Sequence, residues 1–270
     1  MRIVHPRIDA QGARMDRSAD GERPRALVTG ASYGVGAAIA QALAGAGCDL
    51  VLTARHAARL AATAGRVEAA GGRALTLPLD LRSQTSIAEV VATAARELGG
   101  VDLLVNNAAA NLRRRAVDVT PAEWSDVIDT NLTGTFFITQ AVARRMIGAG
   151  RGGAIVNIAS VHGMITAAER SAYGISKAAL IQMTRMLAIE WAQHGIRVNA
   201  VAPGRLITES PQRAQRTNDP GYMAAMVARV PLGRLATVEE VVGAVCWLAS
   251  PGAAAVTGHV MVMDGGLTVV

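Results

Sequence analysis

Lysine, cysteine, aromatic residues and long apolar runs are all scarce in this 270-residue chain, and each scarcity excludes a class of protein. No apolar run approaches the roughly 18 to 20 residues that a membrane span requires, and residues 1–25 do not resemble a secretory signal. We therefore expect a cytoplasmic protein with no membrane partner. Cys48 and Cys246 belong to no CxxC or His/Cys cluster, so we expect neither a disulfide framework nor a metal site.

The net charge of +6 raises the question of an anionic partner. Arginines are scattered along the chain, and Arg113, Arg114 and Arg115 form the one run of basic residues. Aromatic residues make up 3% of the composition, and none is interleaved with that run to stack on bases. We therefore expect no nucleic-acid partner.

A single lysine, Lys177, stands among the 27 lysine and arginine residues. Lysine carries a compact ammonium on a flexible stem, whereas the guanidinium of arginine is planar and wider. A lone lysine in an arginine-rich chain indicates a position where a guanidinium does not serve. Chance placement is the alternative, so the neighbours of Lys177 decide between the two.

Short apolar runs alternate with longer amphipathic segments from residue 25 onward, which is typical of βαβ units. Residues 1–24 lack periodicity, and we interpret them as a flexible N-terminal arm. We expect one α/β domain, 25–270, whose mainly parallel seven-stranded sheet has helices on both faces. The expected strands are 26–29, 50–53, 74–78, 103–105, 154–158, 197–201 and 260–262, and the expected helices are 35–46, 56–70, 84–98, 121–147, 172–193 and 238–249.

Two of these helices begin with capping boxes, Thr120 with Glu123 and Thr237 with Glu240. The segment 203–229 has weak periodicity and contains Pro211 and Pro220, so we expect mostly loop. Long loops in compact domains often cover a site, and we interpret 204–230 as a substrate lid.

Three glycines, Gly30, Gly34 and Gly36, lie between the first expected strand and the first expected helix. Glycines at such a junction allow a tight turn and a close approach of the backbone to a pyrophosphate at the helix N-terminus. A simple tight turn is the alternative, and the absence of a following Lys-Ser/Thr pair excludes a P-loop. Arg55 follows the second expected strand, and its guanidinium favours the 2′-phosphate of NADP(H), while NAD(H) stays possible. The alternative is that Arg55 is a solvated surface arginine without a cofactor contact.

Tyr173 and Lys177 are four residues apart at the start of an expected helix, so they share one face. A nearby ammonium favours the phenolate form of a tyrosine, which suits proton transfer to a carbonyl. A surface pair without chemistry is the alternative, but it leaves the placement of the sole lysine unexplained. Ser160 follows an expected strand at the sheet edge where ligands collect, although a serine there is more often a turn former.

Taken together, these motifs resemble the short-chain dehydrogenase/reductase family over nearly all of residues 25–270. That resemblance implies a Rossmann-type doubly wound fold. Two departures are Ala109, where the family often has glycine, and Tyr33, where NADP-preferring members often have a basic residue. The matching positions, in order, are the 29–36 loop, Asn106-Asn107-Ala108, Asn131, Ser160, Tyr173, Lys177, Pro203-Gly204 and Asp264-Gly265-Gly266.

The resemblance also implies residue roles. Tyr173 would pass the proton, Ser160 would orient the carbonyl, Lys177 would tune Tyr173 and bond the nicotinamide ribose, and Asn131 would hold a relay water. Asp80 would bond the adenine amino group, Asn107 would support the adenosine ribose, and Thr208 would touch the carboxamide. The full set of expected cofactor contacts is Gly30, Ser32, Tyr33, Gly34, Val35, Gly36, Arg55, Asp80, Leu81, Asn107, Ala108, Ala109, Tyr173, Lys177, Pro203, Gly204, Leu206 and Thr208.

The resemblance is strongest to 3-oxoacyl-carrier-protein reductases and to sugar- or polyol-oxidising members, so the expected substrate is a small carbonyl or alcohol that is either free or carrier-linked. The arginine run 113–115 has the charge to bind an acidic carrier protein; the alternative is that it is a solvated loop. We interpret His162, His194 and His259 as structural or surface residues, with His162 close enough to Ser160 to line the pocket. A regulator that kept the fold without the chemistry is the alternative function. The apolar segment 256–270 resembles the segment through which family members form tetramers, so the resemblance implies a homotetramer.

Overall fold

The computed structural model describes residues 23–206 and 220–270 of the chain. Its seven strands form one parallel sheet in the order β3-β2-β1-β4-β5-β6-β7. The order reverses between β1 and β4, so the doubly wound fold predicted from the sequence is confirmed. The strands are β1 (Arg25–Thr29), β2 (Asp49–Ala54), β3 (Ala74–Pro78), β4 (Leu103–Asn106), β5 (Gly153–Ile158), β6 (Ile196–Pro203) and β7 (Val260–Met263).

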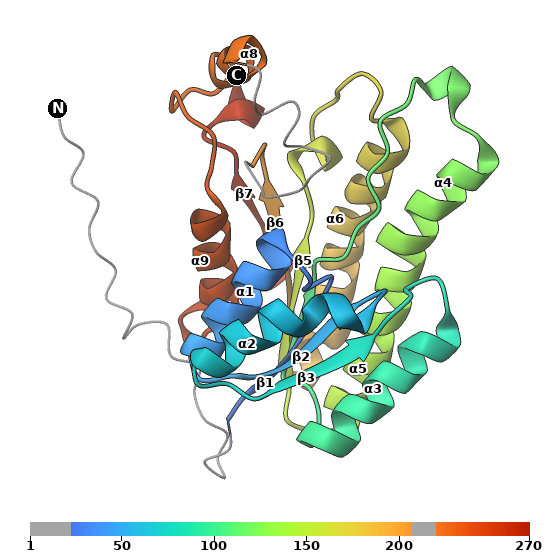
Figure 1. Ribbon diagram of the computed structural model, residues 1–270, viewed down its shortest axis with the longest axis vertical. Helices are drawn as coiled ribbons and strands as arrows, with labels where there is room; N and C mark the ends of the chain where they lie inside the picture. The colour runs from blue at the N-terminus through green and yellow to red at the C-terminus, as the bar shows by residue number, and fades with distance from the viewer. Residues whose placement is uncertain (1–22, 207–219) are drawn as a thin grey trace, which may run out of the picture.

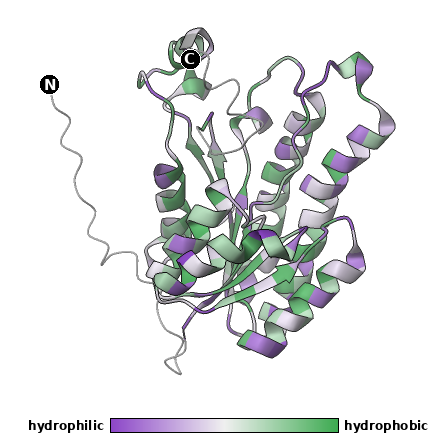
Figure 2. Cartoon of the chain, in the orientation of Figure 1, coloured by the Kyte–Doolittle hydropathy of each residue, from purple (hydrophilic) through white to green (hydrophobic). Residues whose placement is uncertain are grey.

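Helices cover both faces of the sheet (Figure 1). On one face lie α1 (Gly34–Gly45), α2 (Ala61–Ala69) and α9 (Val238–Ala249), and on the other lie α3 (Gln84–Leu98), α5 (Thr135–Ala149) and α6 (Ser171–Trp191). Neighbouring strand residues alternate between the two cores, because Leu27 faces α3, α5 and α6 while Val28 faces α1 and α9. Figure 2 shows the hydrophobic strands enclosed between helices of mixed polarity.

Both predicted capping boxes are present. The Thr120 side chain accepts a hydrogen bond from the Glu123 amide at the start of α4 (Pro121–Ile128), and Thr237 accepts one from the Glu240 amide at the start of α9. The predicted ranges of α3 and α9 match the structure. Short 3-10 segments complete the order at η2 (Ala57–Leu60), η3 (Ala116–Asp118), η5 (Val161–Gly163), η6 (Ala192–His194), η7 (Pro251–Ala253) and η8 (Leu267–Val269).

The single helix expected over 121–147 is interrupted by a π-helical turn, η4 (Asp129–Gly134), between α4 and α5. The backbone of Leu81 packs against this turn so closely that a Cβ at Gly134 would overlap the Leu81 carbonyl. The Thr135 hydroxyl donates to the Thr130 carbonyl, five residues earlier, at 3.1 Å. The wider turn follows from this tertiary contact, which the helical pattern of the sequence does not reveal.

The expectation of mostly loop over 203–229 is wrong for its last part, because α8 (Pro220–Val227) is a helix. Proline is tolerated in a first helical turn, where its missing amide hydrogen would have no partner within the helix. Residues 207–219 of the expected lid, including Thr208, lie outside the described residues.

Of the expected N-terminal arm, residues 1–22 also lie outside the described part. Arg23 Nε lies 2.9 Å from Asp49 Oδ1, and the Asp49 amide donates to the Pro24 carbonyl. No helix within 23–206 and 220–270 has the length and apolar character needed to cross a membrane.

Candidate active site

The expected site residues converge on the carboxyl edge of the sheet. Gly30 follows β1, Asn107 follows β4, Ser160 follows β5 and Gly204 follows β6. Because these strands are parallel and adjacent, their ends meet where the strand order reverses, which is the usual ligand crevice of open α/β sheets. The sheet therefore brings together groups that are up to 174 residues apart in the numbering from Gly30 to Gly204.

The glycine-rich loop is shaped by close contact with the segment after β4. A Cβ at Gly30, whose φ is +68°, would lie 2.8 Å from Ala108 Cα, and a Cβ at Gly36 would overlap Asn107 Nδ2. The Asn107 amide group donates to the Thr29 carbonyl at 3.0 Å and to the Gly30 carbonyl at 2.9 Å. Thr29 Oγ1 accepts the Asn107 and Ala108 amides. Asn107 thus holds the loop, a role beyond the ribose contact that the resemblance implied.

The N-terminus of α1 has no side-chain cap. Tyr33, the N-cap residue, has an extended backbone and an exposed side chain, and the first turn holds no acidic residue. In contrast, Ser83, Thr120 and Thr237 cap α3, α4 and α9 with their side chains. The free amide groups of an uncapped helix end attract anions, so the 30–36 loop fits a dinucleotide pyrophosphate. Ser32 and Val35 of this loop are half-buried.

The adenosine side carries two arginines and one carboxylate. Arg55 is exposed directly after β2, and its charge acts on Asp80 after β3. Both Asp80 oxygens accept hydrogen bonds from the Arg82 guanidinium at 3.2 Å. Hydrogen bonds and charge from Arg82, with a smaller contribution from Arg55, lower the pKa of the Asp80 carboxyl. Asp80 is therefore an ionised acceptor, already paired with Arg82, beside the exposed Arg55.

Lys177 is buried between the start of α6 and the end of β5. Its side chain is 3% exposed, and Nζ donates to the Ile158 carbonyl at 2.7 Å. Burial lowers the pKa of the Lys177 ammonium to about 8. Nζ lies 5.8 Å from the centroid of the Tyr173 ring, so the sole lysine does accompany Tyr173.

The His162 ring reaches the Tyr173 ring because two glycines let the η5 turn, which directly follows Ser160, pack against α6. A Cβ at Gly163 would lie 2.7 Å from the Lys177 carbonyl carbon, and one at Gly174 would lie 2.9 Å from the His162 carbonyl oxygen. Ser160 is 7% exposed, and its Oγ accepts the His162 amide at 3.2 Å, which leaves its hydroxyl hydrogen for another acceptor. The His162 and Tyr173 rings meet edge to face with centroids 6.3 Å apart.

Asn131 lies on the π-helical turn η4 and is 1% exposed. Its amide group donates to the Ala110 carbonyl at 2.9 Å and to Ser176 Oγ at 3.0 Å, while Oδ1 accepts the Ala110 amide at 2.7 Å. Ser176 Oγ in turn donates to the Tyr173 carbonyl at 2.7 Å. Both Asn131 amide hydrogens are therefore used to join η4, the loop after β4 and α6.

The remaining expected contacts also lie on this edge. Gly204 donates its amide to the Met263 carbonyl at 2.9 Å, and Leu206 bridges to Ala236. Pro203 and Leu81 are buried, whereas Ala109 is exposed. Thr208 lies outside the described residues, so its expected contact is not described.

The structure also contains a buried polar network beneath the site, whose residues were not among the site residues expected from the sequence. The Asn106 amide group donates to Thr139 Oγ1 at 2.7 Å and to Asn157 Oδ1 at 2.8 Å, and Asn157 donates to Thr184 Oγ1 at 2.9 Å. The network ties β4 and β5 to α5 and α6. Polar residues at the ends of two apolar strands are the sequence signal that could have revealed it.

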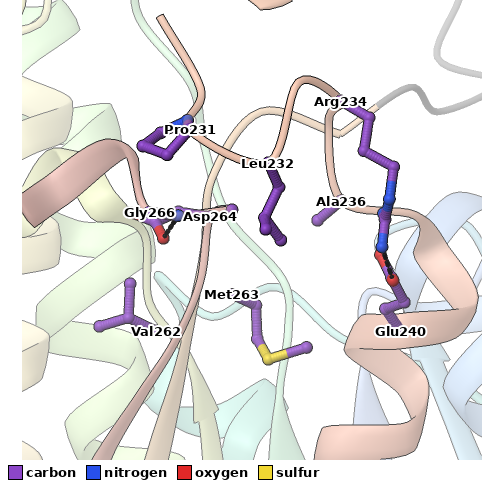
Figure 3. A pocket seen from close by; sticks show the side chains of 10 residues that line it. Pro231, Leu232, Arg234, Ala236, Glu240, Val262, Met263, Asp264 and Gly266 are labelled. Atoms are coloured by element: carbon purple, nitrogen blue, oxygen red, sulfur yellow. Dashed lines mark hydrogen bonds and ion pairs between the residues drawn. The ribbon is translucent and has the colours of Figure 1, made fainter. Parts of the chain in front are cut away.

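Farther along the carboxyl edge, a cavity of about 460 Å³ opens at the end of β7 (Figure 3). The Arg234–Glu240 ion pair and Leu232 line it, and the Asp264 carboxylate beside it accepts the Gly266 amide at 2.9 Å. None of its lining residues belongs to the group around Tyr173. Within 23–206 and 220–270, no three His, Cys, Asp or Glu side chains gather in a way that would hold a metal ion.

Known proteins resemble the chain over nearly its whole length. A family model described as enoyl-(acyl carrier protein) reductase matches residues 30–268. Gluconate 5-dehydrogenase of Gluconobacter oxydans is 38% identical over 91% of this chain and 94% of its own length. A 3-oxoacyl-[acyl-carrier-protein] reductase of Vibrio cholerae is 38% identical over 90% and 96%, respectively.

One solved structure is that of a gluconate 5-dehydrogenase from Burkholderia cenocepacia in complex with NADP and tartrate. It superimposes with a TM-score of 0.88 at 32% identity, and the match covers 97% of this chain and 99% of that one. The likeness therefore includes the sheet, both helical layers and the carboxyl edge.

Proposed function

Because the chain belongs to the short-chain dehydrogenase/reductase family, we propose that it is an NADP(H)-dependent oxidoreductase that interconverts a ketone and a secondary alcohol. The observation that carries this proposal is the buried Lys177 beside Tyr173, with Ser160 at the end of the adjacent strand. The relatives reported above are named for dehydrogenase or reductase activity, so we do not propose the regulator.

When bound, NADP(H) supplies or accepts the hydride. In the reductive direction the Tyr173 hydroxyl donates its proton to the carbonyl oxygen, and in the oxidative direction the phenolate accepts it. The Ser160 hydroxyl donates a hydrogen bond that holds the same oxygen. The Lys177 ammonium favours the phenolate of Tyr173 by its charge. Asn131 keeps Tyr173 and Lys177 aligned through Ser176 and the loop after β4.

Two features support NADP(H) as the preferred cofactor. Arg55 presents an exposed guanidinium after β2, at the position where NAD-binding folds present an acidic residue to the ribose hydroxyls. A guanidinium pairs well with a phosphate, and the solved gluconate 5-dehydrogenase holds NADP. NAD(H) stays a second cofactor because Tyr33 replaces the basic residue often found in the glycine-rich loop.

We also propose the homotetramer and the cytoplasmic location that the sequence predicts. Exposed apolar side chains lie on two separate surfaces, which supports assembly through more than one interface. Trp124, Ile175 and Ile189 are exposed on α4 and α6, while Trp247 and Val270 are exposed on α9 and at the C-terminus. A monomeric mass by light scattering would overturn the tetramer.

The function is tested by following nicotinamide absorbance with NADPH and with NADH against ketoacyl thioesters, ketosugars and cyclic ketones. We expect faster turnover with NADPH. Because Tyr173→Phe removes the donated proton, we expect it to lower kcat by roughly 10²- to 10⁴-fold with unchanged NADPH affinity. Full activity in Tyr173→Phe, or NADPH binding with no turnover of any ketone, would argue against the proposal.

A further inference from the structure

Arg82 lies in the loop between β3 and α3, on the adenosine side of the carboxyl edge. Asp80 comes two residues before it, and the Leu79 amide donates to the Ala54 carbonyl, at the end of β2, at 2.9 Å. Arg55 directly follows Ala54, so the adjacent ends of β2 and β3 place Arg55 and Asp80 close enough for their charges to interact. A carboxylate therefore lies next to the guanidinium that we assign to the 2′-phosphate.

The Asp80 carboxylate is held in one orientation by Arg82. The guanidinium donates through Nε to Oδ1 and through Nη2 to Oδ2, both at 3.2 Å, and the Arg82 amide donates to Oδ1 at 3.0 Å. The Asp80 amide donates to Ser86 Oγ at 3.1 Å, and the Asp80 carbonyl accepts the Ser83 amide at 3.0 Å. Both the backbone and the side chain of Asp80 are thus fixed.

Arg82 is in turn anchored on α4. Its Nη1 donates to Asp126 Oδ1 at 3.0 Å. Both carboxylates raise the pKa of the Arg82 guanidinium, Asp80 more strongly than Asp126. The three side chains are 41 to 50% exposed, and ion pairs at such exposure contribute little to stability. We therefore look for the role of Arg82 in the cofactor site.

Without a partner, the Asp80 carboxylate would oppose an NADP(H) cofactor. The 2′-phosphate of NADP(H) is a phosphate monoester, which carries a charge of about −1.5 to −2 at pH 7. Arg55 supplies one positive charge, and residues 29–36 of the glycine-rich loop contain no charged side chain. The negative charge of Asp80 would offset that of Arg55, so the phosphate would meet little net attraction.

Arg82 removes this opposition. Arg55, Asp80 and Arg82 together carry one net positive charge, whereas Arg55 and Asp80 alone carry none. Asp126 reduces the gain, since it binds the remaining terminal nitrogen of the Arg82 guanidinium. The charges are also exposed to solvent, which weakens their interactions with a ligand. The expected effect on phosphate binding is therefore a few fold.

We infer that Arg82 is a second determinant of the preference for NADP(H), because it orients and neutralises the Asp80 carboxylate and so lets the 2′-phosphate lie beside Arg55. The inference rests on the proposed function, since it assigns a residue of the same cofactor site. Arg82 is a positioning residue, which acts on the phosphate through Asp80.

The test measures the phosphate preference, which we define as the Kd for NADH divided by the Kd for NADPH, by fluorescence titration. We expect Arg82→Gln to lower this ratio about fivefold and to change the Kd for NADH less than twofold. Arg96→Gln, an exposed arginine on α3 that pairs with Glu97, is the matched control and should leave the ratio unchanged. An unchanged ratio in Arg82→Gln, or equal weakening of both cofactors as expected for a structural role, would overturn the inference.

A double variant tests whether Arg82 acts through Asp80. Arg82→Gln combined with Asp80→Asn removes both charges and leaves that of Arg55, so the phosphate preference should return to within twofold of that of the unaltered protein. Circular dichroism and the melting temperature check that each variant folds. If the double variant has as low a preference as Arg82→Gln alone, Arg82 does not act through Asp80 and the inference is wrong.

Fragments of the cofactor make the test independent of turnover. In calorimetric titrations, the unaltered protein should bind 2′,5′-ADP more tightly than 5′-AMP, and Arg82→Gln should weaken 2′,5′-ADP about fivefold without affecting 5′-AMP. Equal binding of the two fragments by the unaltered protein would contradict the inference, and ketone reduction with NADPH would still support the oxidoreductase function. The predicted losses without NADPH-dependent reduction of any ketone would contradict the function while leaving the role of Arg82 intact.

Discussion

The two halves of the carboxyl edge differ in the groups that they present to a ligand, although close glycine contacts occur in both, at Gly30 and Gly36 and at Gly163 and Gly174. Over β1 and β2, the half that we assign to the cofactor depends on absent side chains, since Gly30 and Gly36 pack against Ala108 and Asn107 at distances that no Cβ allows. Over β5 and α6, the half that we assign to the chemistry depends on buried side chains that are held by hydrogen bonds, such as Lys177 on the Ile158 carbonyl. Added atoms should therefore damage the first half, and removed atoms the second.

The difference reflects what each half has to recognise. A pyrophosphate is bound by backbone amides, which a side chain would obstruct, whereas proton transfer needs specific groups with fixed positions.

The largest effect is expected in the chemical half. Ser160→Ala should lower kcat/KM by roughly 10²- to 10³-fold, because it removes the hydrogen bond to the reacting oxygen. Steady-state kinetics with NADPH measure the loss, and Ser125→Ala, an exposed serine on α4, is the matched control. A loss no larger than that of Ser125→Ala would remove Ser160 from the chemical half and break the comparison.

Burial of the Lys177 ammonium should make the free energy of unfolding depend on pH. The Lys177 pKa is about 8 in the folded protein and 10.5 ordinarily, so between these pH values the unfolded chain holds a proton that the folded chain has released. Stability relative to Lys177→Met should therefore rise with pH across this window, by about 3 kcal/mol in total. Urea unfolding from pH 7 to pH 10.5 measures it. The burial-raised pKa values of Cys48 and Cys246 cancel in the difference, and a difference independent of pH would contradict a buried charge.

How far the sequence predicts the site depends on where each residue lies. Tyr173 and Lys177 lie four residues apart on one helix, so their spacing alone predicted that they meet. Ser160 follows a strand, which predicted its place at the sheet edge, whereas its role beside Tyr173 was implied by the family resemblance. The π-helical turn at Asn131 was not predictable from periodicity, because it depends on the Leu81 backbone packing against Gly134.

The helix α8 was not predicted for a local reason. Pro220 was interpreted as a helix breaker, whereas proline is also favoured in the first turn of a helix, where the structure places it.

The cofactor half is tested by adding one methyl group at two glycines of the same loop. Gly36→Ala should weaken NADPH binding more than tenfold and lower the free energy of unfolding by 1 to 3 kcal/mol, roughly, because the methyl group overlaps Asn107. Gly34→Ala has no neighbour within 4 Å and should cost only about 1 kcal/mol for its φ of +61°. Equal effects of the two variants would mean that backbone conformation, and not close packing, shapes the loop.

The smallest effect is expected at the exposed edge of the cofactor half. Arg55→Ala should raise the Kd for NADPH about tenfold and leave that for NADH unchanged, because one charge-assisted contact with the 2′-phosphate is lost. Fluorescence titration measures both, with Arg59→Ala as the neighbouring exposed control. A parallel loss for NADH would assign Arg55 to general cofactor binding and remove the structural reason for NADP(H) preference.

The central claim is that the chemical half requires a lysine, and Lys177→Arg tests it most directly because the charge is kept while the shape changes. The measurement is kcat with saturating NADPH on the panel ketone that the unaltered protein reduces fastest, together with the melting temperature. We predict a loss of kcat of at least about 10²-fold, because the planar, wider guanidinium would have to take the place of a buried ammonium that donates to the Ile158 carbonyl and lies 5.8 Å from the centroid of the Tyr173 ring. A variant that keeps kcat within twofold would show that any buried cation suffices, and it would contradict the account.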